Sequence, residues 1–474
     1  MINSITYDSR NIPLTKNIKK SSNIYSVIIG KNGTGKSRLL QLICDEILNE
    51  KTEKIKFTDR PSRIIAISTT PFDKFSPQTN IKKGYFYQGI KGIDTINLSK
   101  GYLSKFIVDF LLGVINNKIN SLSKALDYLG YEDEITIDFK YLGGDKIKEI
   151  IYEKTDDYSL DDAIYNLNID KENNKKFTLP MSSKITSLDY TLFTKNSYFK
   201  DTRTFQSIRE YLSDRIKLGD KQINQSYIIN DKKLISLVNS LKESEWIHNT
   251  RTLQLVIKDN EILFNKKFVL SNNFIKLIDS GLFKIDKIIL RKKHSKERFE
   301  IGNASSGEQS VIINILGISS IIKDNSLILI DEPEVCLHPE WQEKYITLLI
   351  NIFKNQKKCH FIIATHSPQI IANLNEKNCF ITSIEDNSCN DAKDYIKKSS
   401  DYQLATLFNT PGFKNEYLSR ISLNLLSKIM ANKSIDNEDR DTMNKLLAIK
   451  NKLSSEDPIL SLIISLEEMV GYYG

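Results

Sequence analysis

The segment that most constrains the fold is a glycine-rich turn between an apolar run and an amphipathic segment, SVIIGKNGTGKSRLL at residues 26–40. Its residues 30–37, GKNGTGKS, match the pattern GxxxxGK[ST] in full. Glycines allow successive backbone N–H groups to point toward one centre, and the positive end of a following helix strengthens such an anion site. The β-branched run before the turn predicts a strand, and the spacing of Leu39 and Ile43 predicts a helix after it. The segment therefore predicts a phosphate-binding loop.

The side chains of such a loop have distinct expected roles. Lys36 should reach the β- and γ-phosphates of a nucleotide, and the Ser37 hydroxyl should ligate Mg²⁺. The pattern thus predicts a nucleotide and Mg²⁺ as ligands. The residues expected to surround the nucleotide here are Asn32, Gly33, Thr34, Gly35, Lys36, Ser37 and Arg38.

Polar side chains follow two later apolar runs, each of which predicts a buried strand. Asp331 and Glu332 follow the run 327–330, and His366 follows the run 361–364 by one residue. A carboxylate at a strand tip can hold Mg²⁺ through water, so Asp331 is predicted to support the metal. The adjacent Glu332 can polarise the attacking water as a general base. His366 lies where α/β sheets place ligands, and it is predicted to contact the γ-phosphate.

A fourth motif, SSGEQ at residues 305–309, begins an apolar-faced helix. Small residues at a helix N-terminus can bind an anion, although serine and glycine also cap many ordinary helices. The candidates for this anion site are Ser305, Ser306, Gly307 and Glu308.

The order of the four motifs resembles that of the ATP-binding-cassette (ABC) ATPase family, over about residues 1–90 and 280–385. The resemblance implies an α/β head, with a mixed or parallel sheet and flanking helices, whose second copy completes the site. In that arrangement the Lys36 loop of one protomer faces Ser306 and Gly307 of the other, which implies a homo-oligomer. SSGEQ departs from the LSGGQ of transporters. Together with EPEVCLHP after the DE strand, it resembles the RecF-like, SMC-like and OLD-like branch that works on nucleic acid.

The wide separation of the phosphate loop from SSGEQ predicts a head that is split by an insertion. We expect an N-terminal head lobe at 1–100, a mostly helical insertion at 101–280, a C-terminal head lobe at 281–388 and a helical tail at 389–474, which could dock a partner. Within the insertion, helices are expected at about 103–128, 207–216 and 233–242, and an edge strand at 134–141. No sustained heptads are present, which favours a compact arm over a long rod.

Gln88, in the segment GYFYQGIKG, is the candidate for the glutamine that family members point at Mg²⁺ and the attacking water. A glutamine in an aromatic turn can equally be structural. A second open choice concerns residues 284–298, which carry seven Lys and Arg in a chain of formal net charge +8. The cluster could neutralise nucleic-acid phosphates, or it could be the solvated turn of a hairpin between two head strands.

Other chemistries find little support in the sequence. Glu385, Asp386 and Asp391 offer acids as a Toprim nuclease would, but no DxD follows them, and the five histidines are scattered. The five cysteines form no CxxC pair, and no window approaches the roughly 18 apolar residues of a membrane helix. We therefore expect a cytoplasmic ATPase, without membrane contact, that does not itself cut nucleic acid.

A finer resemblance rests on RIIAISTTPFDKF at residues 63–75, YFYQG at 85–89 and SSDYQLATLFNTPGFKNEYLSR at 399–420. These segments are similar to the PtuA family of ATPases in Septu and Septu-containing retron antiphage systems. The resemblance implies an ATP-hydrolysing subunit that controls a separate HNH nuclease of the PtuB kind, with DNA or retron nucleic acid as a candidate partner. The alternatives are a PARIS-type ATPase, a RecF-like or SMC-like DNA-repair ATPase without a nuclease partner, and an ATP-loaded scaffold or sensor with little turnover.

Overall fold

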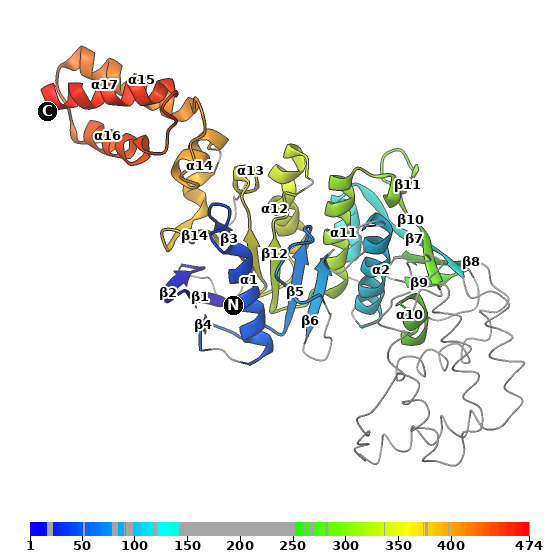
Figure 1. The fold of residues 1–474 in the computed structure, drawn as a ribbon. Helices are drawn as coiled ribbons and strands as arrows, with labels where there is room; N and C mark the ends of the chain where they lie inside the picture. Colours follow the sequence, from blue (N-terminus) through cyan, green and yellow to red (C-terminus); the bar gives the residue numbers. More distant parts are fainter. Residues whose placement is uncertain are drawn as a thin grey trace, which may run out of the picture. The chain divides into compact units, whose positions relative to one another are not determined.

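In the computed structural model the chain forms two compact units (Figure 1). One consists of Met1–Gly92 with Ala304–Gly474, and the other of Ile93–Asn303. The expected helices at 207–216 and 233–242 lie outside the described residues. The described residues are 1–16, 22–50, 53–77, 84–89, 91, 98–116, 121–141, 252–259, 261–265, 270–279, 283–335, 337–372, 374, 378–396 and 398–473.

The first unit is built on a seven-stranded sheet of order β15-β14-β3-β13-β12-β5-β6. Every neighbouring pair is parallel except β14 with β15. The strands predicted around the phosphate loop, the DE pair and the histidine are confirmed. Their bounds and those of the other strands are β3 Ile24–Ile29, β5 Arg63–Ser68, β6 Tyr85–Gly89, β12 Ser326–Asp331, β13 His360–Ala364, β14 Cys379–Ser383 and β15 Ser388–Asp391.

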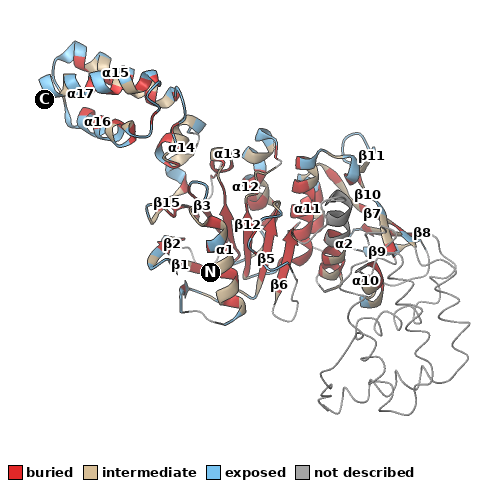
Figure 2. Cartoon of the chain, viewed as in Figure 1, coloured by how far each residue is buried: buried red, intermediate tan, exposed pale blue. Residues whose placement is uncertain are grey.

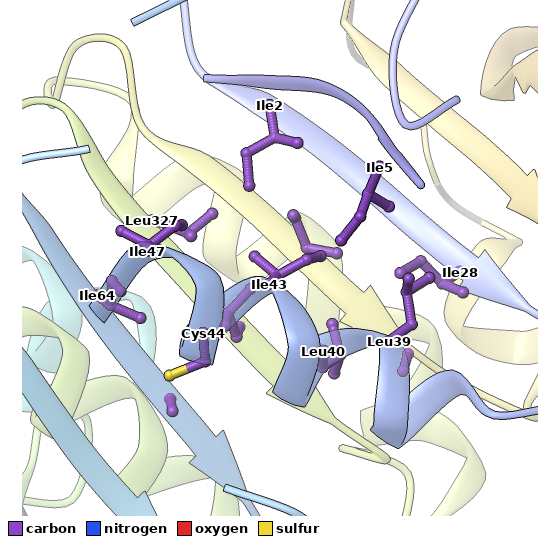
Figure 3. Close-up of a cluster of buried hydrophobic side chains, with 14 of the residues drawn as sticks. Ile2, Ile5, Ile28, Leu39, Leu40, Ile43, Cys44, Ile47, Ile64 and Leu327 are labelled. Carbon is purple, nitrogen blue, oxygen red and sulfur yellow. The ribbon is translucent and has the colours of Figure 1, made fainter. Parts of the chain in front are cut away.

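Helices flank this sheet, and the central strands are buried along their length, as their near-continuous apolar runs require (Figure 2). A small sheet of order β2-β1-β4 accompanies them. Figure 3 shows Leu39, Leu40 and Ile43 of α1 packed among Ile5 and Ile28 in one buried cluster. The bounds are α1 Lys36–Leu48, α11 Ser306–Ile321, α12 Pro339–Phe353, α13 Pro368–Ile371, β1 Ile2–Tyr7, β2 Arg10–Pro13 and β4 Ile55–Phe57.

The parallel register brings the polar sequence motifs to one edge of the sheet. Asp331 at the end of β12 lies opposite both Ser68 of β5 and Ala364 of β13. Ala364 in turn lies opposite Ile28 of β3. The residues that directly follow these strands therefore emerge side by side, where α/β sheets bind their ligands.

The C-terminal part of this unit is helical, as predicted, and has a core of its own. Leu418, Leu425 and Ile429 of α15 pack with Met443 and Leu446 of α16. The bounds are η6 Ala392–Tyr395, α14 Ser400–Thr406, α15 Glu416–Asn432, α16 Asn437–Lys450 and α17 Pro458–Tyr473. None of the described helices is long and apolar enough to cross a membrane.

The second unit contains a five-stranded antiparallel sheet of order β11-β10-β7-β8-β9. The predicted strand near 134–141 is present as β7, but it is a central strand, so its assignment to an edge was wrong. Because its alternating pattern shows only one buried face, it could not show that a strand pairs on each side. The bounds are β7 Tyr131–Tyr141, β8 Thr252–Lys258, β9 Glu261–Phe264, β10 Phe283–Lys292, β11 Arg298–Glu300, α2 Leu98–Asn116, α3 Leu122–Tyr128, α10 Asn272–Asp279 and η5 Ile301–Asn303.

The basic segment 284–298 forms the hairpin of β10 and β11, as one of the two alternatives predicted. Its strand β10 pairs with β7, so the hairpin lies in the second unit, whereas the sequence had placed residues 284–298 between two head strands. The first unit resumes at Ala304, so the predicted head boundary at 281 falls within the second unit. The described part of the expected helical insertion also holds strands β7, β8 and β9 beside α2, α3 and α10.

Candidate active site

The phosphate loop connects β3 to α1, and its glycines take backbone conformations that side chains rarely adopt. Gly35, which caps α1, has φ 96°. A Cβ atom at Gly35 would lie 2.4 Å from the Tyr7 hydroxyl, so this position admits only glycine without local rearrangement. Asn32, Gly33 and Arg38 are exposed around the loop, and the Thr34 hydroxyl donates to the carbonyl of Lys31 at 2.9 Å.

Lys36 lies under this loop and is only 4% exposed. Its Nζ donates to the carbonyl oxygens of Gly30 and Lys31, at 2.9 and 3.0 Å, and lies 3.2 Å from Nδ1 of His366. Burial lowers the pKa of Lys36 to about 8, against the opposing effect of nearby carboxylates, of which Glu332 is the strongest. A buried ammonium held by neutral carbonyls is well suited to an anionic ligand.

Ser37, the next residue, donates its hydroxyl proton to Oδ1 of Asp331 at 3.0 Å. Asp331 is buried, and burial raises the pKa of its carboxyl to about 7, with Glu332, Asp73 and Glu334 adding to the effect. A divalent cation beside Asp331 would compensate this concentration of negative charge.

These two oxygen ligands fit Mg²⁺ in particular. Mg²⁺ prefers oxygen and is usually held by one or two protein groups, with phosphates and water supplying the rest. Within the described ranges no group of three His, Cys, Asp or Glu side chains is arranged to hold a metal by itself. The pair Ser37 and Asp331 therefore suits a metal that arrives with a phosphate ligand.

Glu332 and His366 form the third pair of the site. Nε2 of His366 lies 3.1 Å from Oε1 of Glu332. Because the ammonium of Lys36 donates to Nδ1, we assign the ring proton to Nε2, which then donates to the carboxylate. This hydrogen bond is the main cause that lowers the pKa of Glu332, so the carboxylate is ionised and able to accept a proton.

Comparison with known proteins bears on this arrangement. The family described as "AAA ATPase domain" matches residues 6–371, a span that begins in β1 and ends in α13. The chain belongs to the AAA ATPase domain family. Membership implies that this ATPase binds a nucleotide.

Two of its relatives come from retrons. The ATPase is 24% identical to the retron Vc95 probable ATPase of Vibrio cholerae over 381 residues. This match covers 74% of this chain and 67% of the relative. It is 33% identical over 88 residues to the retron Ec83 probable ATPase of Escherichia coli, which covers 16% of each protein. Protein ea59 of Escherichia phage lambda is 27% identical over 147 residues, 31% of this chain and 25% of that protein.

A solved structure of the Smc head domain of Pyrococcus furiosus, bound to part of ScpA, aligns with 82% of this chain and 94% of its own. The identity is 13% and the TM-score 0.24. On the family match, the retron relatives and the parallel sheet, the chain is an ABC-type ATPase that resembles retron-associated ATPases. The resemblance expected from the sequence is confirmed at this level.

The SSGEQ motif of the ATPase opens α11, as predicted, but remains apart from the phosphate loop of the same chain. The Ser305 hydroxyl accepts a hydrogen bond from the backbone N–H of Glu308 at 3.3 Å and so caps the helix. Ser306 is exposed, and Gly307 is buried. In the described part of the ATPase, neither Ser305 nor Ser306 hydrogen-bonds to loop 30–37.

Gln88 is not brought to the other predicted site residues. It lies on β6, the edge strand, opposite Ile67 of β5, so β5 separates it from β12 and Asp331. At the usual strand spacing β6 is about 10 Å from β12. The Gln88 side chain is 5% exposed and packs over Gly317 of α11, where a Cβ atom would lie 2.2 Å from Oε1. The contact of Gln88 with Mg²⁺ stays a prediction: among the described residues its buried amide has no hydrogen-bond partner, and it lies two strands from Asp331.

Three residues at the site were missed. The Thr69 hydroxyl donates to the backbone carbonyl of Glu332 at 3.0 Å. Glu334 accepts a short hydrogen bond from the backbone N–H of His366, and Glu385 accepts one from the N–H of Lys31 at 2.9 Å. Thr69 and Glu385 come shortly after strands β5 and β14, as Glu332 comes after β12. The order of the strands in the sheet, had it been known, would have placed both residues at the site.

Proposed function

We propose that this ATPase hydrolyses ATP in the presence of Mg²⁺ and serves as a subunit of an antiphage defence complex. The observation that carries the proposal is the unbroken contact from Lys36 through His366 to Glu332, next to the pair Ser37 and Asp331. A buried ammonium, an ionised carboxylate and two oxygen groups that could bind a metal thus lie at a single edge of the sheet.

Each residue of this set has a role in the proposed reaction. Lys36 exchanges its loop carbonyls for the β- and γ-phosphates and stabilises their charge. Ser37 and Asp331 would hold Mg²⁺, which supplies further charge neutralisation of the phosphates when it is bound. Glu332 takes a proton from the attacking water while the bond from the γ-phosphorus to the bridging oxygen breaks, and ADP and phosphate result. His366 orients Glu332 and contacts the γ-phosphate.

We further propose that two heads enclose the nucleotide. The support is the exposed Ser306 at the N-terminus of the 16-residue helix α11, where the helix dipole favours an anion. The Ser306 hydroxyl of one protomer would then face the Lys36 loop of the next. ATP-dependent dimerisation, measured by light scattering, should be lost in Ser306→Arg, because the larger cation obstructs the contact.

The effector of the complex is proposed to be a separate HNH nuclease of the PtuB kind, with this chain in the place of PtuA. The resemblance of segments 63–75 and 399–420 supports this assignment, as do the retron names of two relatives. Glu385, which a Toprim site would use as its first acid, accepts a hydrogen bond from the phosphate loop. Native mass spectrometry of the co-expressed pair tests the assignment, and failure to co-purify would contradict it.

The decisive test of hydrolysis is Glu332→Gln. The amide keeps the size of the side chain but cannot accept the water proton, so turnover should fall by at least about 100-fold while ATP remains bound. The matched control is Glu340→Gln on α12, where an exposed carboxylate pairs with Lys344. Undiminished hydrolysis by Glu332→Gln would remove Glu332 from the mechanism. Negligible turnover by the unaltered protein, with and without DNA, would favour the scaffold alternative.

A further inference from the structure

Glu332 has a backbone conformation that its own sequence disfavours. Its φ is 48°, in the left-handed region where a residue other than glycine is uncommon. It also precedes Pro333, and a residue before proline ordinarily has an extended backbone. Such a conformation persists only where surrounding contacts hold it, and it is often found at functional sites.

Contacts from two neighbouring strands hold Glu332. Its backbone N–H donates to the carbonyl of Ala364, the last residue of β13, at 2.9 Å. Its own carbonyl accepts a turn hydrogen bond from the N–H of Val335 at 3.2 Å and a second one from the Thr69 hydroxyl at 3.0 Å. Thr69 directly follows Ser68, which lies opposite Asp331, so the contact follows from the register of β5 and β12.

We infer that Thr69 is a positioning residue for hydrolysis: its hydroxyl fixes the left-handed backbone of Glu332 and thereby directs the carboxylate toward His366. The inference rests on the proposed function, in which Glu332 is the base. Thr69 acts through the backbone of Glu332, 3.0 Å away, and is assigned no contact with phosphate.

The loop that carries Thr69 is itself held in place by hydrogen bonds to the buried Asp73. The carboxylate of Asp73, which is 3% exposed, accepts hydrogen bonds from the Tyr87 hydroxyl at 2.6 Å and from the N–H of Phe75 at 2.9 Å. The loop is therefore tied to β6 within four residues of Thr69. An anchored donor constrains the base better than a mobile one, because small misplacements of a catalytic group reduce the rate strongly.

The neighbouring Thr70 provides a matched control. Its hydroxyl lies 3.4 Å from that of Ser68, and its N–H donates to the Ser68 hydroxyl at 3.1 Å. Thr69→Val and Thr70→Val remove the same hydroxyl, with little change of volume, from adjacent positions of one loop. A general disturbance of the loop would affect both variants, whereas loss of the Glu332 contact affects only the first.

The experiment measures ATP affinity and the single-turnover hydrolysis rate for Thr69→Val, Thr69→Ser and Thr70→Val. We expect Thr69→Val to slow hydrolysis by about 10- to 100-fold with unchanged ATP affinity, since the base is misdirected and the phosphate loop is intact. Thr69→Ser keeps the hydroxyl and should restore the rate to within about 5-fold of the unaltered protein, as should Thr70→Val. Thr69→Ala provides a second hydroxyl-free variant if the valine side chain impairs folding.

A double-variant cycle separates this inference from the proposed function. When Glu332→Gln has removed the base, adding Thr69→Val should lower the residual rate no further. Full activity in Thr69→Val, with Glu332→Gln inactive, would overturn the inference and leave the proposed function standing. Full activity in Glu332→Gln would remove Glu332 from the mechanism and the inference for Thr69 with it, whereas negligible turnover by the unaltered protein would overturn the proposed function. Weaker ATP affinity in Thr69→Val, in parallel with the slower rate, would also contradict a positioning role.

Discussion

The active-site edge of the head and the β10–β11 hairpin of the second unit are both rich in charged side chains. In the head some of these side chains are buried, whereas in the hairpin they form ion pairs near the surface. In the head, Lys36 and Asp331 are buried, and burial shifts both pKa values toward the neutral forms. In the hairpin, Arg291 and Lys296 form ion pairs with Glu132, and Lys293 pairs with Asp127.

The comparison shows why a count of charges is a poor guide to chemistry. Exposed ion pairs contribute little to stability and leave little net charge for a ligand. Buried groups that are short of compensating charge gain much more when a ligand supplies it. The ion pairs of Arg291, Lys293 and Lys296 therefore weigh against a nucleic-acid contact through these three side chains. In the head, a phosphate and a metal would supply the charge that Lys36 and Asp331 lack.

The largest expected effect comes from Lys36→Met, which keeps the length of the side chain and removes its charge. ATP hydrolysis should fall by at least about 1,000-fold, because the phosphates lose the buried cation that neutralises them. Lys56→Ala, at an exposed position on β4, is the control and should remain within about twofold of the unaltered rate. Equal losses in both variants, measured by phosphate release, would show that burial of the lysine is irrelevant.

His360 is a buried titratable group that lies outside the candidate active site. His360 is 1% exposed, and its Nδ1 accepts from the N–H of Ile2 at 3.2 Å while Nε2 lies 2.8 Å from the Ser26 hydroxyl. Burial lowers the pKa of His360 to about 3 from 6.5. Because the unfolded chain binds a proton more readily, stability should be full above pH 6.5 and decline as pH falls toward 3.

The decline due to His360 has an upper limit of about 1.4 kcal/mol per pH unit. Urea titrations at pH 7, 6 and 5 measure it, with His360→Gln as the comparison. That variant should be less stable at pH 7 but should lose less stability on acidification. Parallel pH curves for the two proteins would contradict the assignment of a buried neutral imidazole.

A smaller effect concerns the pH dependence of ATP affinity. The pKa of Lys36 is about 8 before nucleotide binds, and the bound phosphates require the charged form. The dissociation constant for ATP should therefore rise with pH above 8, by at most about tenfold per unit. Fluorescence titrations with a nucleotide analogue between pH 7 and 9.5 measure this. A flat profile would mean that the ammonium keeps its charge in spite of burial.

The smallest effect is expected at the hairpin. Changing Arg291, Lys293 and Lys296 together to alanine should leave ATP hydrolysis unchanged and should shift the melting temperature by less than about 3 °C, as exposed pairs do. Salt-dependent binding of duplex DNA should also be the same with and without these substitutions. A loss of DNA binding in the triple variant would show that the hairpin cations contact DNA and would favour the DNA-repair alternative.

Local patterns were sufficient for most of the head. The sequence around Lys36 specifies strand, turn and helix within a few residues, and Asp331 and His366 each follow an apolar run of strand length. The C-terminal helices were equally visible, because their apolar stripes repeat at helical spacing. In each of these segments the information lies within about 15 consecutive residues.

What depends on pairing between distant segments was not predictable. Gln88 was chosen from its neighbours in sequence, but its distance from Asp331 is decided by the strand β5 that lies between them. The sheet that includes β10 was missed for a similar reason, because its partner β7 is separated from it by more than a hundred residues. Thr69 looks like any polar residue after a strand until its register with Glu332 is known.

The position of β6 has a consequence for how this protein can vary. The segment Ile93–Asn303 leaves the head after β6, the last strand of the sheet, and returns before α11. Along the chain it lies between β5 and β12 and between β3 and β13, but these strands are neighbours in the sheet, so the segment leaves from the edge of the sheet and interrupts none of these pairs. A change in the length of this segment is therefore expected to leave the strands of the candidate active site in place.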